Sequence, residues 1–197
     1  RSRYEDLNFA VYFTDLTTNK TEQKRFDIRL SKEPVHVYLL GRNNSRNPKL
    51  PVTAYVSTFY ADGTPAICDV EIKGKYEKSN DEKTLTKIKT NQYGAGKFTF
   101  TAPQNENSDE DFELKISAVD EKARRGTFSE EIYFTAKDAL KIQIDKTIFK
   151  PGENIKATIL STQKEAIVYV DVVKDWAVVE SFFIRLKNGK GELKIPY

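Results

Sequence analysis

Residues 140–160 read LKIQIDKTIFKPGENIKATIL: a strand-like run, a polar turn with a proline–glycine corner, and a second strand-like run. A weaker copy of this order, VHVYLLGRNNSRNPKLPVTAYVSTF, extends from Val35 to Phe59. When Val52 is aligned with Ile155, the two copies lie about 100 residues apart, which is the length of one β-sandwich module. The sequence therefore predicts tandem modules of this size.

Nearly every segment alternates apolar and polar residues with a period of two, and turn residues separate these segments. The pattern predicts an all-β chain. A short helix over residues 129–137 is the competing interpretation, but Ile132 and Phe134 alternate there with more polar neighbours, which favours a strand. The predicted strands are Leu7–Thr14, Lys24–Leu30, Val35–Leu40, Val52–Tyr60, Ala66–Tyr76, Leu85–Lys89, Gly96–Ala102, Phe112–Val119, Ser129–Thr135, Leu140–Ile144, Asn154–Leu160, Ile167–Lys174, Val178–Leu186 and Gly191–Ile195.

Glycine and proline mark the turns between these strands. Gly63 follows Asp62 and supplies the positive φ that a tight hairpin requires. Pro151 and Gly152 fit the two corners of a type II turn. We expect further turns of the hairpin kind at residues 91–94 and 187–190.

The predicted strands divide the chain into three parts. Residues 32–137 hold seven of them, enough for one complete immunoglobulin-like antiparallel β-sandwich. We expect residues 1–31 to be the closing strands of a preceding module and residues 138–197 to be the start of a following one. In the alternative arrangement, the N-terminal hairpin completes the C-terminal sheet of a two-domain unit. Because Arg1 is not an initiator and no signal peptide precedes the first strand, we expect a segment of a longer protein.

Composition argues against several classes of protein. The chain of 197 residues carries 32 basic and 29 acidic side chains along its whole length, and this near balance gives no reason to expect a nucleic-acid partner. No apolar run approaches the roughly 18 residues of a membrane span, so we expect no membrane contact by this segment. The presence of 12 Phe and 10 Tyr residues argues against disorder.

The one cysteine and the one histidine of the chain are both expected to have structural roles. Cys68 shares a strand face with Val70 and Ile72, so we expect a buried small hydrophobe, and one cysteine forms no internal disulfide. His36 has no Cys, Asp or Glu at metal-ligand spacing and is expected to be a satisfied or surface side chain. Since no nucleophile, general-base or phosphate-loop motif occurs, we predict no catalytic residue, no metal site and no cofactor, and no enzyme activity.

An acidic cluster, Asp109, Glu110 and Asp111 with Glu106 nearby, is the best candidate for a calcium site. Calcium requires six or more oxygen ligands, and the cluster offers three or four, so a solvated loop is the favoured interpretation.

Three other surface features have both a structural and a functional interpretation. Trp176 lies at a predicted hairpin tip, where burial against a neighbouring module would explain an apolar side chain. A basic hairpin tip could contact an acidic partner, although simple solvation is favoured, and it contains Lys122, Arg124 and Arg125. Two N-x-[ST] sequons, relevant only in a host that glycosylates, begin at Asn19 and Asn43.

Several phrases resemble the macroglobulin-like domains of the alpha-2-macroglobulin family. DKTIFKPGE, from Asp145 to Glu153, is similar to the TDKPIYKPGE signature that opens such a module. YADGTPA at residues 60–66 resembles the PDGTPA turn of the family, and TNQYGAGKFTF at residues 90–100 resembles its TDEYGIASFTF strand entry. The match extends from about residue 35 to residue 197, and the lack of disulfides is more similar to the bacterial members.

The resemblance implies a function for a parent protein. Members of the family are broad-spectrum endopeptidase inhibitors: a protease cuts a bait segment, the ring of modules collapses around it, and a thioester can capture it. This chain has no Cys-x-Glu-Gln thioester motif, so the resemblance implies a scaffold segment without chemistry of its own. Its expected partners are neighbouring macroglobulin-like domains and, for the full-length protein, target proteases. The expected location is extracytoplasmic, whether periplasmic, cell-surface or secreted.

Two other functions remain as alternatives to the inhibitor scaffold. The first is a generic β-sandwich repeat module of a cell-surface adhesin or binding protein, acting as a spacer or ligand-binding unit. The second is the accessory sandwich of a glycoside hydrolase.

Overall fold

The computed structural model describes residues 3–41, 47–103, 110–135 and 137–196. Every helix or strand assigned within these ranges is a β-strand, and every strand pair is antiparallel. The prediction of an all-β antiparallel chain is therefore confirmed. Within the same ranges, no helix is long and apolar enough to cross a membrane.

Fourteen strands occur in the described ranges, each overlapping its predicted position. They are β1 (Tyr4–Asp15), β2 (Lys20–Ser31), β3 (Val35–Leu40), β4 (Val52–Tyr60), β5 (Cys68–Tyr76), β6 (Lys83–Lys89), β7 (Ala95–Phe100), β8 (Glu110–Asp120), β9 (Arg125–Phe134), β10 (Leu140–Ile144), β11 (Asn154–Ser161), β12 (Ala166–Lys174), β13 (Ala177–Leu186) and β14 (Lys190–Pro196). The sheets have the orders β1-β2, β3-β4-β7, β6-β5-β8-β9, β10-β11-β14 and β12-β13.

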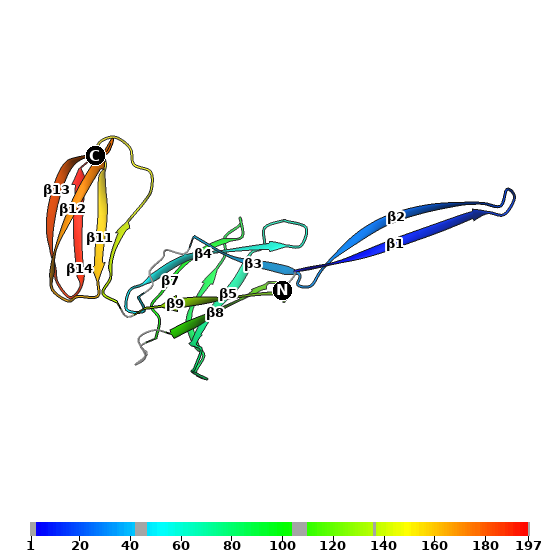
Figure 1. Cartoon of the computed structure of the whole chain (residues 1–197), viewed down its shortest axis with the longest axis horizontal. Helices are drawn as coiled ribbons and strands as arrows, with labels where there is room; N and C mark the ends of the chain where they lie inside the picture. The colour runs from blue at the N-terminus through cyan, green and yellow to red at the C-terminus, as the bar shows by residue number, and fades with distance from the viewer. Residues whose placement is uncertain (1–2, 42–46, 104–109, 136, 197) are drawn as a thin grey trace.

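Strands β1 and β2 form a long two-stranded hairpin that extends away from the rest of the chain (Figure 1). Strand alternation gives the hairpin one apolar face, where Leu7 is opposite Ile28 and Phe9 is opposite Phe26. Neither β1 nor β2 pairs with any strand of the two C-terminal sheets. The alternative arrangement, in which it completes the C-terminal sheet of the same chain, is therefore wrong.

The middle of the chain is a β-sandwich of the sheets β3-β4-β7 and β6-β5-β8-β9. Inward-facing side chains of both sheets form one apolar core, as alternation along each strand dictates. Phe112 lies at the centre of an aromatic cluster, with ring centroids 5.0 Å from Tyr76, 5.6 Å from Phe134 and 6.2 Å from Phe100. Its side chain is completely buried. This cluster joins the two sheets.

The two sheets come closest where β9 crosses β3. A Cβ atom built on Gly126 would lie 1.9 Å from the backbone oxygen of Val35. Only a residue without a side chain allows the two backbones to approach this closely. Strand β3 contacts both β8 and β9, so these two strands close the sandwich on its β3 side.

The C-terminal unit, residues 140–196, repeats the first five strands of the sandwich. Strands β10, β11 and β14 pair as β3, β4 and β7 do, and β12 pairs with β13 as β5 pairs with β6. Register shifts occur at matching places in the two units, between Ile72 and Lys73 and between Val172 and Val173. The unit has no strands that correspond to β8 and β9.

The turn that contains Pro151 and Gly152 connects β10 to β11. Gly152 has φ +83°, the value that the second corner of a type II turn requires, so that prediction is confirmed. Glu153 donates its backbone N–H to the Lys150 carbonyl at 3.0 Å, and its carboxylate pairs with Lys146. Gly63 has φ +85° in the β4–β5 connection, as predicted.

Candidate functional site

His36 lies in β3 and fixes the base of the N-terminal hairpin. Its Nε2 is 2.7 Å from the hydroxyl of Ser31, and its Nδ1 is 3.2 Å from the hydroxyl of Tyr4. Because Ser31 donates its proton to the Glu33 carbonyl, the bond pattern assigns the imidazole proton to Nε2 and the acceptor role to Nδ1. His36 is thus a buried, satisfied side chain, as the sequence predicted.

A second contact at the base of the hairpin comes from Arg3. Its guanidinium donates to the Val37 carbonyl at 2.8 Å and lies 4.1 Å from the Tyr38 ring centroid. Close by, Thr127 of β9 donates its hydroxyl to Glu33 at 2.6 Å. The hairpin is therefore anchored to the sandwich by polar contacts and has no shared apolar core with it.

Cys68 begins β5 and is 1% exposed, so the predicted burial of the side chain is confirmed. Burial raises the pKa of its thiol, which opposes formation of the reactive thiolate. The position therefore favours packing over thiol chemistry.

Asp120, the last residue of β8, holds a buried polar cluster that the sequence analysis missed. Its carboxylate accepts hydrogen bonds from the backbone N–H groups of Lys122 and Arg124, both at 2.9 Å. It also accepts from the Arg124 guanidinium at 2.7 Å and from the Tyr60 hydroxyl at 3.0 Å. Lys122 and Arg125 are exposed at this turn, in line with the favoured interpretation of a solvated tip, and the half-exposed Arg124 also pairs with Asp120. An Asp followed by a tight turn is the signal that would have indicated the cluster.

The pKa of the Asp120 carboxyl reflects two opposing effects. Burial alone would raise it, but the hydrogen bonds from Arg124, Tyr60 and Lys122 prevail and lower the pKa to about 2. The same cluster raises the pKa of Tyr60, first through burial and then through its bond to the carboxylate. The cluster ties the β8–β9 turn to the end of β4.

We expect Asp120 to make the sandwich sensitive to acid. Its pKa in the folded chain lies below the ordinary aspartate value of 3.8, so its stabilising effect is complete above about pH 4 and is lost as the pH falls toward about 2. The urea-unfolding midpoint of the wild type should therefore fall more steeply than that of Asp120→Asn between these pH values. The remaining carboxylates are common to both proteins. If the two plots of urea midpoint against pH ran parallel, Asp120 would contribute nothing to the acid sensitivity of the sandwich.

The other surface candidates lie apart from one another. Trp176 is fully exposed at the β12–β13 turn with φ +65°, so no contact within this chain provides the expected burial. Asn19 is exposed in the β1–β2 turn with φ +53°. Asn43, Glu106 and Asp109 lie outside the described residues. Asp111 is half-buried in β8. No group of three or more His, Cys, Asp or Glu side chains in the described ranges could hold a metal ion.

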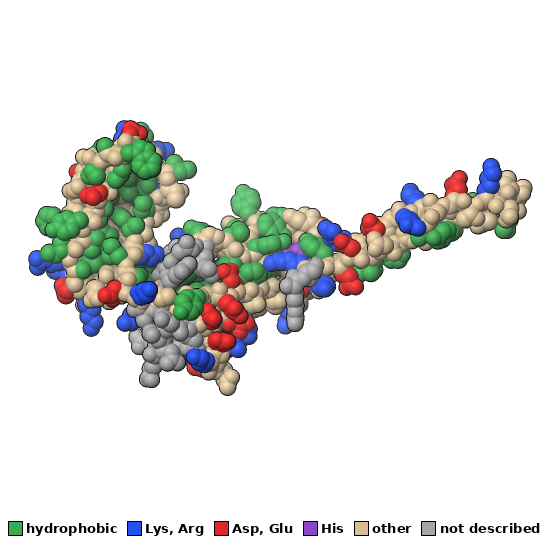
Figure 2. Space-filling model, in the orientation of Figure 1, with side chains coloured by type: hydrophobic (Ala, Val, Ile, Leu, Met, Phe, Trp, Pro, Cys, Tyr) green, Lys and Arg blue, Asp and Glu red, His purple; other side chains and the backbone are tan. Residues whose placement is uncertain are grey.

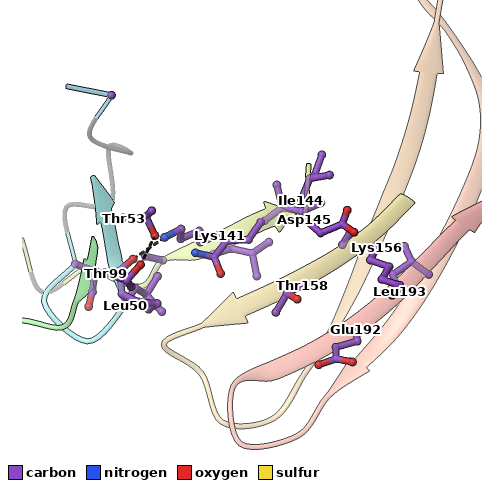
Figure 3. A pocket seen from close by; sticks show the side chains of 18 of the residues that line it. Leu50, Thr53, Thr99, Lys141, Ile144, Asp145, Lys156, Thr158, Glu192 and Leu193 are labelled. Carbon is purple, nitrogen blue, oxygen red and sulfur yellow. Dashed lines mark hydrogen bonds between the residues drawn. The ribbon is translucent and has the colours of Figure 1, made fainter. Parts of the chain in front are cut away.

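A groove of about 1400 Å³ lies between the central sandwich and the C-terminal unit (Figure 3). One wall comes from β4, β7 and the segment before β4, and the other comes from β10, β11 and β14. Lysines exceed acidic residues in its lining: Lys97, Lys137, Lys141, Lys156 and Lys194 against Asp138, Asp145 and Glu192.

A hydrogen bond from Lys141 crosses this groove and ends on a backbone carbonyl. Figure 3 shows the Lys141 side chain reaching from β10 toward Leu50 and Thr53, and its ammonium group donates to the Pro51 carbonyl at 2.5 Å. Burial lowers the pKa of Lys141. Asn47 is 3% exposed and donates its side-chain amide to the Lys137 carbonyl at 2.7 Å. Lys141 therefore provides a polar joint between the two units, whereas the Asn47 bond lies within the central part of the chain.

The groove fits a joint between structural units better than a catalytic centre. Its described lining includes lysine, threonine and acidic side chains but no histidine, cysteine or serine that could act as an activated nucleophile or general base. The Lys141 contact fixes the C-terminal unit against the sandwich at this groove.

Neither the protein-family models nor the curated proteins give a match to this sequence. The structure is similar to solved bacterial alpha-2-macroglobulins. Trypsin-activated alpha-2-macroglobulin from Escherichia coli matches 89% of this chain at 15% identity, with a TM-score of 0.42. Salmonella alpha-2-macroglobulin reacted with methylamine matches 92% of it at 13% identity, with a TM-score of 0.39. The chain spans 16% of the length of each of these proteins.

Proposed function

We propose that this chain is a scaffold segment of an alpha-2-macroglobulin-like, broad-spectrum protease inhibitor, with no chemistry of its own. The observation that carries the proposal is the position of the three family phrases. DKTIFKPGE forms the β10–β11 connection, YADGTPA forms the β4–β5 connection and TNQYG forms the β6–β7 connection. Each phrase thus serves as a turn of a repeated sandwich, which is the role that the resemblance implies.

The proposal includes a division into modules. Residues 32–137 are a complete macroglobulin-like domain, residues 1–31 are the closing strands of a preceding one, and residues 138–197 begin a following one. The separation of the sheets supports this division, because no sheet contains strands from two of these parts. The partners are then neighbouring macroglobulin-like domains, with target proteases for the whole inhibitor, at an extracytoplasmic location.

The two polar joints suggest how such a segment would serve a trap. The His36 cluster joins the hairpin to the sandwich through two side-chain hydrogen bonds, and the Lys141–Pro51 hydrogen bond joins the C-terminal unit to it, whereas the core of the sandwich is closely packed and apolar. Units joined in this way can rotate as rigid bodies while their cores stay intact. A collapse after bait cleavage would therefore use the joints and leave the sandwich unchanged.

The test compares the full-length polypeptide that carries this segment with the 197-residue chain alone. After incubation with trypsin, the full-length protein should suppress hydrolysis of casein but spare hydrolysis of a small chromogenic peptide, because a trapped protease excludes only large substrates. The isolated chain should change neither rate. Unchanged casein hydrolysis with the full-length protein would refute the inhibitor proposal, and inhibition by the isolated chain would refute the scaffold role.

A further inference from the structure

The groove between the sandwich and the C-terminal unit is lined by lysines that have no acidic partner. None of its five lysines forms an ion pair with a carboxylate of the described residues. These groove lysines are Lys97, Lys137, Lys141, Lys156 and Lys194. They come from both walls, so the groove has positive charge on either side.

The acidic residues of the lining are engaged with other groups. Asp138 accepts a hydrogen bond from the Gln163 amide at 2.8 Å. Asp145 accepts one from the backbone N–H of the next residue at 3.1 Å. Glu192 pairs with Lys190, which lies outside the lining, at 2.8 Å. The chain itself therefore leaves the charge of the groove lysines unneutralised.

Lysines on the outer face of the larger sheet of the sandwich are arranged differently. Each of those on β5, β6 and β8 has a glutamate partner: Lys73 and Lys115 pair with Glu82 at 3.5 and 3.1 Å, Lys75 with Glu113 at 3.6 Å, and Lys87 with Glu71 at 3.1 Å. Figure 2 likewise shows acidic and basic side chains next to one another on the sandwich. The groove thus departs from the way this chain builds a solvated lysine face.

Two of the groove lysines face each other directly. Lys156 of β11 is the register partner of Lys194 of β14, so the two side chains lie on one face of the sheet. Like charges directly opposite one another destabilise a strand pair. An anion placed between the two ammonium groups would remove this repulsion.

Lys141 is the third lysine with an unmet requirement. Its ammonium group has three N–H donors, and among the described residues one of them goes to the Pro51 carbonyl at 2.5 Å. Burial lowers the pKa of Lys141, because the charged amine is partly withdrawn from water without a carboxylate beside it. A carboxylate is a stronger acceptor than water for the remaining donors.

We propose that the groove binds an extended acidic segment of a polypeptide. Carboxylates of the segment would lie against Lys141 at one end of the groove and between Lys156 and Lys194 at the other. Charge complementarity carries the assignment, since the ligand supplies the carboxylates that the lining lacks. The proposal goes beyond the scaffold role and does not depend on it.

The spacing of the lysines favours an extended peptide over a single small anion. Lys141 is opposite Leu160, and Leu160 lies four residues beyond Lys156 in β11. At about 3.3 Å per residue the two lysines are about 13 Å apart along the sheet, which equals two same-face steps of an extended chain. Thr158 lies between them on the same face, so its hydroxyl can donate to the peptide. The volume of about 1400 Å³ also exceeds that of an ordinary small-molecule pocket.

The lining favours a peptide over a nucleic acid. A polynucleotide has a charge on every unit, so its phosphates would also meet Asp138, Asp145 and Glu192. A peptide can place acidic side chains at the lysines and neutral ones at these carboxylates. The described lining contains no arginine, the side chain best suited to hold a phosphate with two parallel hydrogen bonds.

The test uses the 197-residue chain and a short fluorescein-labelled peptide of alternating glutamate and serine. Fluorescence anisotropy should show saturable binding that weakens as sodium chloride is added, because salt screens the charges. The matching peptide of glutamine and serine should not bind. Absence of saturable binding by the glutamate peptide, or equal binding by the glutamine peptide, would overturn the proposal.

Two double variants with the same change in net charge locate the site. Lys156→Gln combined with Lys194→Gln should weaken binding of the glutamate peptide about 10-fold, because two ion pairs are lost. Lys73→Gln combined with Lys115→Gln removes two lysines that are already paired with Glu82, and this control should bind within about 2-fold of the wild type. Equal losses in the two double variants would show attraction to the net charge alone and would overturn the site.

A single variant separates binding from folding. Lys194→Glu places a carboxylate opposite Lys156, so the strand pair gains a cross-strand ion pair in place of a repulsion. Its urea-unfolding midpoint should equal or exceed that of the wild type, while binding of the glutamate peptide falls about 10-fold or more. Unchanged binding by this folded variant would overturn the assignment of Lys156 and Lys194 to the site.

A competition experiment addresses the other class of polyanion. A single-stranded oligonucleotide should displace the labelled peptide less effectively than the unlabelled glutamate peptide does, because its phosphates also meet the carboxylates of the lining. More effective displacement by the oligonucleotide would overturn the peptide assignment in favour of a nucleic acid.

Discussion

Replacement of Phe112 by alanine should lower the free energy of unfolding of the central sandwich by about 3–5 kcal/mol. The ring is fully buried and packs between Tyr76, Phe100 and Phe134, which come from both sheets. It also fills the space above Gly74, where an added Cβ would lie 2.2 Å from its Cζ atom. Its neighbours are fixed in strands on either side, so the resulting cavity can collapse only in part.

The measurement is urea unfolding followed by circular dichroism, with hydrogen exchange of the β5 and β8 amides to locate the loss. Phe183→Ala is the matched control, since that phenylalanine is 75% exposed on β13 and its removal should change stability by less than about 0.5 kcal/mol. Equal effects of the two substitutions would contradict the assigned core.

A single added methyl group at Gly126 should cost about 3 kcal/mol, the upper part of the range for overpacked sites. The added Cβ in Gly126→Ala would meet the Val35 carbonyl oxygen at 1.9 Å and its carbon at 2.7 Å. Both atoms belong to the backbone, so no rotamer change can relieve the contact. Strand β9 must move away from β3, which opens the sandwich on the side that these strands close.

Gly96→Ala is the control for this substitution. Gly96 also lies in a strand of the sandwich, but its added Cβ would meet the tip of the flexible Ile88 side chain at 2.7 Å. A small rotation of Ile88 accommodates the methyl group, so the urea midpoint should change little. If Gly126→Ala lowered the urea midpoint no more than Gly96→Ala, the close approach of the β9 and β3 backbones at Gly126 would be contradicted.

Alternation and turn chemistry were sufficient to predict the strands of this chain. Val35–Leu40, Val52–Tyr60 and Leu140–Ile144 have the predicted bounds, because a polar turn or a glycine ends each run abruptly. The strands of the N-terminal hairpin are longer than predicted. Beyond Thr14 and before Lys24 their side chains are polar, so the apolar period ends while the backbone ladder continues.

The polar clusters were beyond the reach of sequence reasoning. Asp120 bonds to Tyr60, which lies 60 residues away in the sequence, and Lys141 bonds to a backbone carbonyl of another unit. Periodicity places a residue on a face of its own strand but does not say which distant residue it will meet. The burial of Trp176 against a neighbouring module stays a prediction, because an apolar residue at a hairpin tip does not reveal whether a covering surface is present.

The base of the N-terminal hairpin has a mechanical consequence. The chain enters the hairpin at Arg3 and leaves it at Lys32, and these two residues are hydrogen-bonded to each other at 3.1 Å. Tension applied at Arg3 would therefore open the hairpin from its base and load its strand pairs one after another, not all together. The length released from Tyr4 to Ser31 would be roughly 90 Å. The hairpin would thus act as a weak, extensible element in series with a stiff sandwich.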